Sequence, residues 1–205
     1  MSISAVIDTN ILVSSLLSRH PDSATRKVVA AVSDGTITPM VNLEILSEYQ
    51  GVLGRAKFRF SSEDISDLLE IFSVKSESYI PEVSVSDFID EDDYKIYATY
   101  RLRDDSYLVT GNLRHFPKES RILSPVDMVH ILEIIERSDI LSDPRGEYIS
   151  EVNANKLKRA QAAMERMRQS AVANGLSDMS MEEIDEEIRL AREEKKNKKN
   201  CEGEL

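Results

Sequence analysis

The segment Ala5–Leu17, AVIDTNILVSSLL, decides how the rest of this sequence is interpreted. Residues 3–7 form a short apolar run rich in β-branched side chains, which is typical of a strand buried on both faces. Apolar residues resume with helical spacing after Asn10, so we expect the strand to lead directly into a helix. Asp8 and Thr9 then lie at the carboxyl end of the strand, where open α/β sheets bind ligands. The alternative is that Asp8 only caps the helix.

The composition limits the functions open to this chain. Its 205 residues carry 37 acidic and 26 basic side chains, a formal net charge of −11, whereas a protein that binds nucleic acid through charge alone needs an excess of Lys and Arg. A nuclease that reaches phosphates through metal ions stays compatible with this charge. The single cysteine, Cys201, excludes an intrachain disulfide and a cysteine metal cage. No apolar stretch reaches the roughly 20 residues that span a bilayer, and no basic signal-peptide region precedes the first strand, so we expect a cytoplasmic protein without membrane contact.

Helical and strand patterns alternate beyond the first helix. The spacing predicts helices over residues 24–32, 43–53, 61–72 and 126–137, a further helix after the acidic segment near residue 90, and strands over residues 36–41, 75–85, 106–110 and 121–123. This order predicts an α/β fold, a three-layer sandwich with a central, mainly parallel sheet.

The acidic segment Asp87–Asp93 holds five acidic residues in seven positions. Two like charges at about 4 Å repel by about 1 kcal/mol in water, and by about 4 kcal/mol at an effective dielectric constant of 20. One explanation is a solvated helix start with Asp90 as its cap, because the helix dipole favours negative charge there. The other is a cation site, which would relieve the repulsion.

Acidic and amide side chains from several elements can meet at one edge of the predicted sheet. Asp8 and Asn112 each follow a strand, Asp90 and Asp93 open a helix, and Glu48 lies in the helix after the second strand. Mg²⁺ prefers hard oxygen ligands of this kind and keeps several of its waters. Held there, it can activate a water molecule and stabilise charge on a phosphate.

These segments, in this order, resemble the PIN-domain nucleases, and more narrowly the toxins of type II toxin–antitoxin modules (VapC-like). The resemblance covers roughly residues 3–135, about two-thirds of the chain. It rests on four pieces: Val6–Val13, Glu48–Leu53 with Arg55 and Lys57, Asp90–Asp93, and Tyr107–Phe116.

The resemblance implies an endoribonuclease that depends on Mg²⁺ or Mn²⁺ and has RNA as its substrate. It implies catalytic roles for Asp8, Glu48, Asp93 and Asn112, metal ligation by Asp8, Asp90 and Asp93, and substrate contacts by Thr9, Asn10 and Arg114. The family commonly has Thr-Gly-Asp where this chain has Thr110-Gly111-Asn112. An amide can accept a hydrogen bond but brings no charge, which weakens the case for a second metal. Glu44 shares a helical face with Glu48 and competes for its role.

Local basic groups would have to hold RNA in so acidic a protein. Arg114 and His115 adjoin Asn112, and residues 55–60, RAKFRF, form a basic-aromatic patch. For His115 the alternative is a packing or surface role. For residues 55–60 it is the end of a helix with the phenylalanines turned inward.

The composition changes near the C-terminus. We predict a nuclease domain over residues 1–137, a linker over 138–150, and a helical extension over 151–205 with a disordered basic end. A capping box at Ser180 opens the second helix of the extension. The apolar seams of the two helices are Leu157, Ala160, Met164, Met167 and Ala171, and Met181, Ile184, Ile188 and Ala191. Two helices with such narrow apolar seams cannot bury enough surface to fold alone, so they must pack on another surface.

The sequence of residues 174–188 resembles the toxin-binding tail of some small antitoxins. The resemblance implies self-inhibition by residues 151–195, with a basic side chain such as Arg189 or Arg192 in the acidic pocket, or else a separate antitoxin partner. A dimerisation arm or a tail that binds another protein are the alternatives.

Two hypotheses follow from the sequence. The first is a metal-dependent ribonuclease toxin, which we expect to form a homodimer, and the second is a PIN-fold binding or regulatory protein held inactive by its own tail. A phosphatase of the Asp-x-Asp type is disfavoured because Asn10 stands where its second Asp would be. A phosphoreceiver is disfavoured because no acidic pair precedes the end of the first strand.

Overall fold

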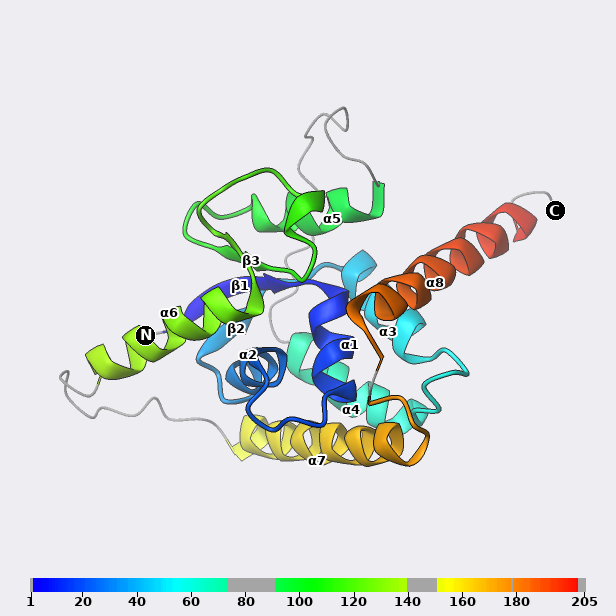
Figure 1. The fold of residues 1–205 in the computed structure, drawn as a ribbon, viewed down its shortest axis with the longest axis horizontal. Coiled ribbons are helices and arrows are strands. Elements are labelled where there is room, and N and C mark those ends of the chain that lie inside the picture. The colour runs from blue at the N-terminus through cyan, green and yellow to red at the C-terminus, as the bar shows by residue number, and fades with distance from the viewer. Residues whose placement is uncertain (1, 74–90, 140–150, 178, 203–205) are drawn as a thin grey trace.

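The structure is a computed structural model that describes residues 2–73, 91–139, 151–177 and 179–202 (Figure 1). Its strands are β1 (Ile3–Ile7), β2 (Ile37–Pro39), β3 (Tyr107–Val109) and β4 (Ile122–Leu123). They form one sheet in the order β2-β1-β3-β4, and every pair is parallel. The strand predicted over residues 75–85 lies outside the described residues.

Helices cover both faces of the sheet, and further helices follow at the C-terminal end. They are α1 (Thr9–Leu17), α2 (Ala24–Ser33), α3 (Leu43–Leu53), α4 (Ser62–Phe72), α5 (Glu91–Tyr100), α6 (Pro125–Asp139), α7 (Glu151–Ala173) and α8 (Met181–Glu202), with a short 3-10 turn at Leu113–His115. In Figure 1, α5 lies on one side of the sheet, and α1, α2 and α4 lie on the other. The predicted three-layer α/β sandwich with a C-terminal helical extension is confirmed.

The central strand β1 is the most buried element of the sheet. Ala5, Val6 and Ile7 have no exposed surface, as expected for a strand with neighbours and helices on every side. In the parallel register with β3, Ile7 stands opposite Val109. The next backbone amide, that of Asp8, donates to the Val109 carbonyl oxygen at 2.9 Å. The ends of β1 and β3 are therefore held side by side, which places the side chains that follow them at one edge.

Helix α7 packs against α4 and α1 (Figure 1). Four side chains of its predicted seam are buried: Ala160, Met164, Met167 and Ala171. They join the same apolar core as β1 and α1. The apolar seam of α7 thus extends the core of the α/β sandwich and does not form a separate core. The proposed division at residues 137 and 151 stays a prediction, and residues 140–150 of the predicted linker lie outside the described part.

Helix α8 lies along α1 and α3. The predicted capping box is present, since the Ser180 amide donates to the Glu183 carboxylate at 2.8 Å and the Glu183 amide donates to the Ser180 hydroxyl at 3.2 Å. Contrary to the prediction of a disordered basic end, the helix continues through residues 195–200 to Glu202. Lys and Glu are good helix formers, so a helix already nucleated by packing extends at little cost.

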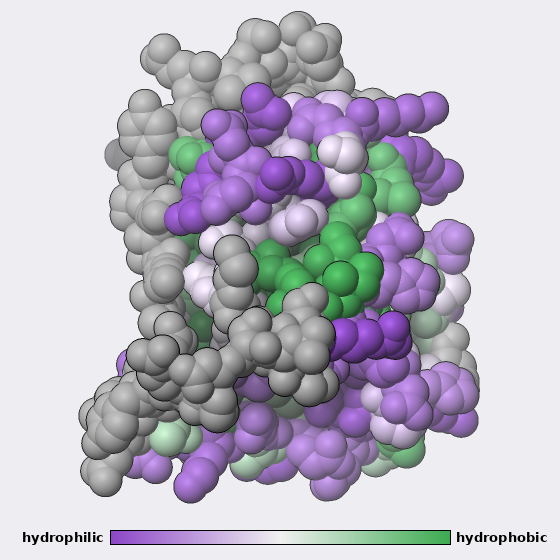
Figure 2. Space-filling model, turned by 90° about the vertical axis from the view of Figure 1, so that its left-hand side faces the viewer, coloured by the Kyte–Doolittle hydropathy of each residue, from purple (hydrophilic) through white to green (hydrophobic). Residues whose placement is uncertain are grey.

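On the face at the α6 end of the molecule, hydrophilic residues surround a hydrophobic patch near the centre of the view (Figure 2). Two large exposed apolar side chains, Val126 and Ile134, belong to α6. Within the described residues, no helix is long and apolar enough to cross a membrane. The expected homodimer stays a prediction.

Shortening the side chain of Met167 should destabilise the whole domain, because Met167 is only 1% exposed between α7 and the core. Met167→Ala is expected to lower the free energy of unfolding by about 2–5 kcal/mol, measured by urea denaturation. The control is Val172→Ala on the same helix, where the side chain is 55% exposed and little should change. If α7 were only a loose arm, the two variants would unfold alike.

Candidate active site

Asp8 occupies the junction between β1 and α1. It stands at the N-cap position, but its side chain makes no capping hydrogen bond. Its Oδ2 instead accepts from the Thr110 hydroxyl at 2.6 Å and from Asn10 Nδ2 at 3.0 Å. Burial raises the pKa of Asp8 to about 7, and the nearby carboxylates of Asp93 and Glu48 add to the rise. The Asp8 side chain is therefore part of the polar group at the edge of the sheet and does not cap the helix.

Glu48 reaches the same edge from α3. Asn42 caps this helix, its Oδ1 accepting from the Ile45 amide at 2.8 Å. The Glu48 carboxylate accepts from the Thr9 hydroxyl at 2.5 Å, and its side chain is only 12% exposed. Glu44 lies one turn earlier, on the wall of a cleft of about 660 Å³ between α3 and α8. Of the two competing glutamates, Glu48 is the one beside Asp8 and Thr9.

Asp93 comes from the start of α5. One of its oxygens, Oδ2, lies 3.0 Å from His115 Nδ1. The contact gives His115 a place beside the acidic cluster and not only a packing or surface role. Asp90, the other acid predicted in this segment, lies outside the described residues.

Arg192 of α8 connects two of these carboxylates. Its Nε and Nη2 donate to the two oxygens of Glu48 at 3.0 and 3.1 Å, and its Nη1 donates to Asp93 Oδ1 at 3.3 Å. The side chain is 13% exposed. Burial alone would lower the pKa of Arg192, but Glu48 and Asp93 raise it overall, so the guanidinium stays charged.

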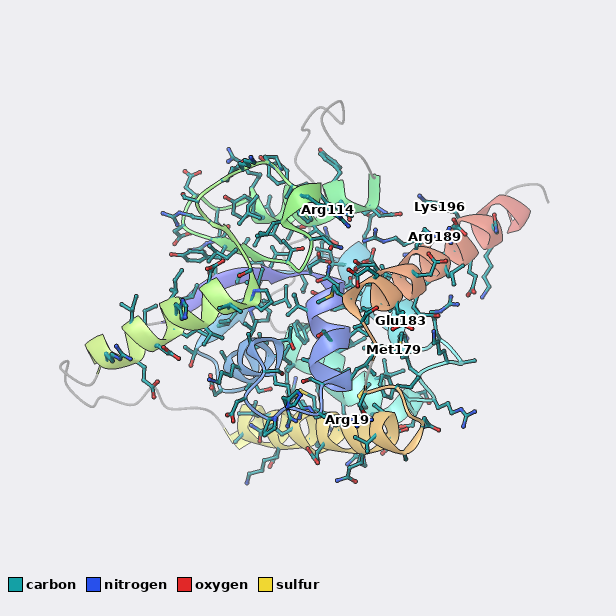
Figure 3. The ribbon with its side chains drawn as sticks, in the orientation of Figure 1. Arg19, Arg114, Met179, Glu183, Arg189 and Lys196 are labelled. Carbon is teal, nitrogen blue, oxygen red and sulfur yellow. The ribbon has the colours of Figure 1, made fainter. Side chains whose placement is uncertain are left out.

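Arg189, the other basic side chain predicted for the pocket, does not enter it. It pairs with Glu186 and Glu193 on its own helix and is about half exposed (Figure 3). It lies about 60° farther round the helix from the buried stripe than Arg192 does, on the side that faces away from the sandwich. Arg192 alone fulfils that part of the prediction.

The remaining predicted site residues are distributed over several roles. Asn112 donates through Nδ2 to Asp185 of α8 at 2.8 Å, so its amide group contacts the extension. Asn10 links Asp8 to the backbone of the Thr110-Gly111 turn, where its Oδ1 accepts from the Gly111 amide at 3.1 Å. Arg114 is exposed on the 3-10 turn (Figure 3). Thr9 and Asn10 donate hydrogen bonds to Glu48 and Asp8, and their predicted contacts with substrate stay predictions.

The carboxylates have the right chemistry for a hard cation, but their arrangement does not form a metal site as it stands. Among the described residues, no group of three or more His, Cys, Asp or Glu side chains converges as a metal site requires. The positive charge between Glu48 and Asp93 is the Arg192 guanidinium. A cation and Arg192 would therefore compete for the same oxygens.

The sequence does not predict the contacts of Thr110 and Glu187. The Thr110 hydroxyl donates to Asp8, and the position of Thr110 at the end of β3 is the signal in the sequence for this contact. Glu187 of α8 holds both Arg55 and Lys57. No local pattern signals a pairing between residues 130 and 132 positions apart.

The comparisons with known proteins give one match. The family model for the PIN domain matches residues 4–114, a stretch that includes Asp8, Glu48, Asp93 and Asn112. No curated protein matches the chain, and no solved structure does.

The buried charge of Asp8 should make stability depend on pH. In the unfolded chain Asp8 loses its proton near pH 3.8, but in the folded chain only near pH 7, so its contribution to stability is complete below pH 3.8 and is lost as the pH rises through 7. Asp8→Asn lacks this loss. In EDTA the variant should gain roughly 1–3 kcal/mol on the wild type between pH 4 and pH 8, measured by urea denaturation.

The matched control is Asp22→Asn, which removes an exposed carboxylate from the loop before α2. Its stability relative to the wild type should be nearly the same at both pH values. An equal gain in both variants would mean that net charge, and not the burial of Asp8, sets the pH dependence.

Proposed function

This chain belongs to the PIN-domain family, and from that premise we propose that it is a metal-dependent endoribonuclease of the kind that serves as toxin in toxin–antitoxin modules. PIN domains are in general nucleases. The observation that carries the proposal is that Asp8 after β1, Glu48 of α3 and Asp93 of α5 lie near one another at the edge of the sheet: Glu48 and Asp93 share Arg192, and both interact electrostatically with Asp8.

Such a gathering needs a functional explanation, because it works against stability. Burying Asp8 among other carboxylates raises its pKa, which means that its charged form is held at a cost in free energy. Perturbed carboxylates of this kind cluster at functional sites. Neighbouring groups also fix each one: Thr110 and Asn10 hold Asp8, Thr9 holds Glu48, and His115 contacts Asp93.

The proposed cofactor is Mg²⁺ or Mn²⁺, and the proposed substrate is RNA. A divalent cation at these carboxylates would supply the positive charge that Arg192 supplies in the described conformation. Asn112 takes the place of the family's common fourth acid but donates its amide to Asp185, so we assign it no metal. Arg114, exposed beside the cluster, is the proposed contact for an RNA phosphate.

We also propose that helix α8 holds this nuclease inactive, which joins the two hypotheses of the sequence. Arg192 neutralises Glu48 and Asp93. Two further contacts seat the helix beside it: Lys195 donates to the Ser47 hydroxyl at 2.9 Å, and Lys196 pairs with Asp92 at 3.1 Å. The extension would then act as an antitoxin does, from within the same chain. A separate antitoxin and an exchange of tails within a homodimer are the other arrangements of the same contacts.

The inhibition is best tested by a point substitution in the full chain. Removing everything after residue 137 would strip α7 from the core and expose the apolar surfaces of α4 and α1. Arg192→Gln keeps the helix and removes only the charge.

Arg192→Gln should release activity. It is expected to raise the rate of cleavage of a fluorescent single-stranded RNA in Mn²⁺ by at least about tenfold, on the scale of one lost charge-assisted interaction, and to tighten Mn²⁺ binding in calorimetry. Arg189→Gln is the matched control and should behave as the wild type, since Arg189 pairs only within α8 in the contacts described above. A folded Arg192→Gln protein with unchanged metal affinity and unchanged cleavage would refute inhibition by α8.

Asp93→Asn should abolish the activity that Arg192→Gln releases. In that background the rate is expected to fall by roughly 100-fold or more, because a charged group at the reacting centre is lost. Asp105→Asn, an exposed carboxylate paired with Arg103, is the control and should leave the rate unchanged. Equal cleavage by all three proteins would point to a contaminating nuclease and against the proposed site.

A further inference from the structure

Helix α8 carries charged side chains on both edges of its buried stripe. Ile184 and Ile188 lie in the middle of the stripe and are 2% and 5% exposed. At 100° per residue, Glu187 falls at one edge, and Asp185 and Arg192 fall together at the other. Each of the three contacts the sandwich, so the underside of α8 presents a fixed pattern of charges to it.

Glu187 is the buried acid of this pattern. Its Oε2 accepts from Arg55 Nε at 2.6 Å and its Oε1 from Lys57 Nζ at 2.8 Å, while the residue as a whole is only 7% exposed. Burial by itself raises the pKa of Glu187, but Lys57 and Arg55 lower it overall. The carboxylate is therefore ionised and shares its two oxygens between two cations.

The two cations lie just beyond the helix that carries a proposed catalytic carboxylate. Arg55 follows α3 directly, about two helical turns beyond Glu48. The segment is fixed by a fully buried Phe58, whose amide donates to the Arg55 carbonyl oxygen at 3.0 Å. Phe58 stacks on Phe60 with ring centroids 5.7 Å apart, so its ring packs in the core and is not available to stack on a nucleotide base. Arg55 and Lys57 remain at the surface beneath α8.

A stabilising role alone explains this arrangement poorly. A buried ion pair often contributes little net stability, since the cost of removing both charges from water offsets their attraction. Two cations that converge on one anion with two oxygens do suit the two non-bridging oxygens of a phosphodiester, for which Arg supplies directed donors and Lys a point charge.

We infer that Arg55 and Lys57 form a binding site for an RNA phosphate, and that Glu187 occupies it as a substitute for that phosphate. The inference rests on the proposed ribonuclease function. It means that α8 places the Glu187 carboxylate where an RNA phosphate would lie, and the Arg192 guanidinium where a metal cation would lie. Glu187 and Arg192 are about 7.5 Å apart along the helix axis, a separation that a short stretch of single strand can span. The helix thus blocks substrate and cation separately.

The test measures RNA binding without catalysis. The affinity of a short fluorescein-labelled oligouridylate for the full-length protein is determined by fluorescence anisotropy in EDTA, over a series of salt concentrations, in the wild-type and Arg192→Gln backgrounds. Glu187→Gln should tighten binding roughly tenfold in the Arg192→Gln background, where the other edge of α8 is released. The slope of log K against log salt should steepen by about 0.7 for each phosphate newly bound.

Two matched variants make the result specific. Glu186→Gln removes the same charge from the exposed face of α8, where Glu186 pairs with Arg189, and should leave the affinity unchanged. Arg55→Gln combined with Glu187→Gln should cancel the gain. Equal effects of Glu186→Gln and Glu187→Gln, or a gain that survives the loss of Arg55, would overturn the inference, provided that circular dichroism shows folded proteins.

These outcomes are separable from those of the proposed function. RNA binding that follows Glu187 and Arg55, in a protein that never cleaves, would support this site and contradict the nuclease. Cleavage released by Arg192→Gln, with RNA affinity indifferent to Glu187 and Arg55, would contradict this site and leave the nuclease standing.

Discussion

The compensation of buried negative charge at the end of β1 is the constraint on which the arrangement of this protein depends. Asp8 cannot leave this place, because its backbone amide completes the pairing of β1 with β3. Asp93 approaches from α5, which packs on β1 and β3, and Glu48 from α3, whose Tyr49 hydroxyl donates to the Ile7 carbonyl oxygen. Carboxylates that meet in a buried place need a positive partner. In the described conformation that partner is Arg192, which comes from 144 residues beyond Glu48 and draws the C-terminal helix onto the sheet edge.

The two C-terminal helices are held on the sandwich by different proportions of apolar and polar contacts. Helix α7 buries Met164, Met167 and Ala171 in the common core, and it also forms ion pairs with α4, such as Arg166 with Asp64. Helix α8 buries only a thin stripe around Ile184 and Ile188, and much of its contact is polar: Asp185 to Asn112, Glu187 to Arg55 and Lys57, Arg192 to Glu48 and Asp93. Polar contacts of this kind weaken in salt, whereas apolar packing does not. The contact of α8 therefore depends more on salt concentration than the contact of α7, which has the larger buried apolar part.

The sequence was most informative where structure follows from neighbouring residues. The strand–helix junction at Asp8, the capping box at Ser180 and the seam of α7 are all local patterns, and each is present. It failed where the outcome depends on distant partners. Asn112 looks like a weakened metal ligand in sequence, but it contacts Asp185 because α8 lies there. Likewise, Lys195–Asn200 reads as a charged tail, yet the packed start of α8 lets the helix continue through it.

The covalent link between the sandwich and α8 changes what can open the site. Only the short connection Asn174–Ser180 separates α8 from the anchored α7, so the helix stays at a high effective concentration over its own target. A separate inhibitor would dissociate when the protein becomes scarce, but a tethered one occupies the site equally at every protein concentration. Neither dilution nor the relative rates of synthesis of two proteins would therefore change how fully α8 occupies the site. Under the proposed inhibition, the site would open to ions or a ligand that compete with the helix, or to a cut in the connection.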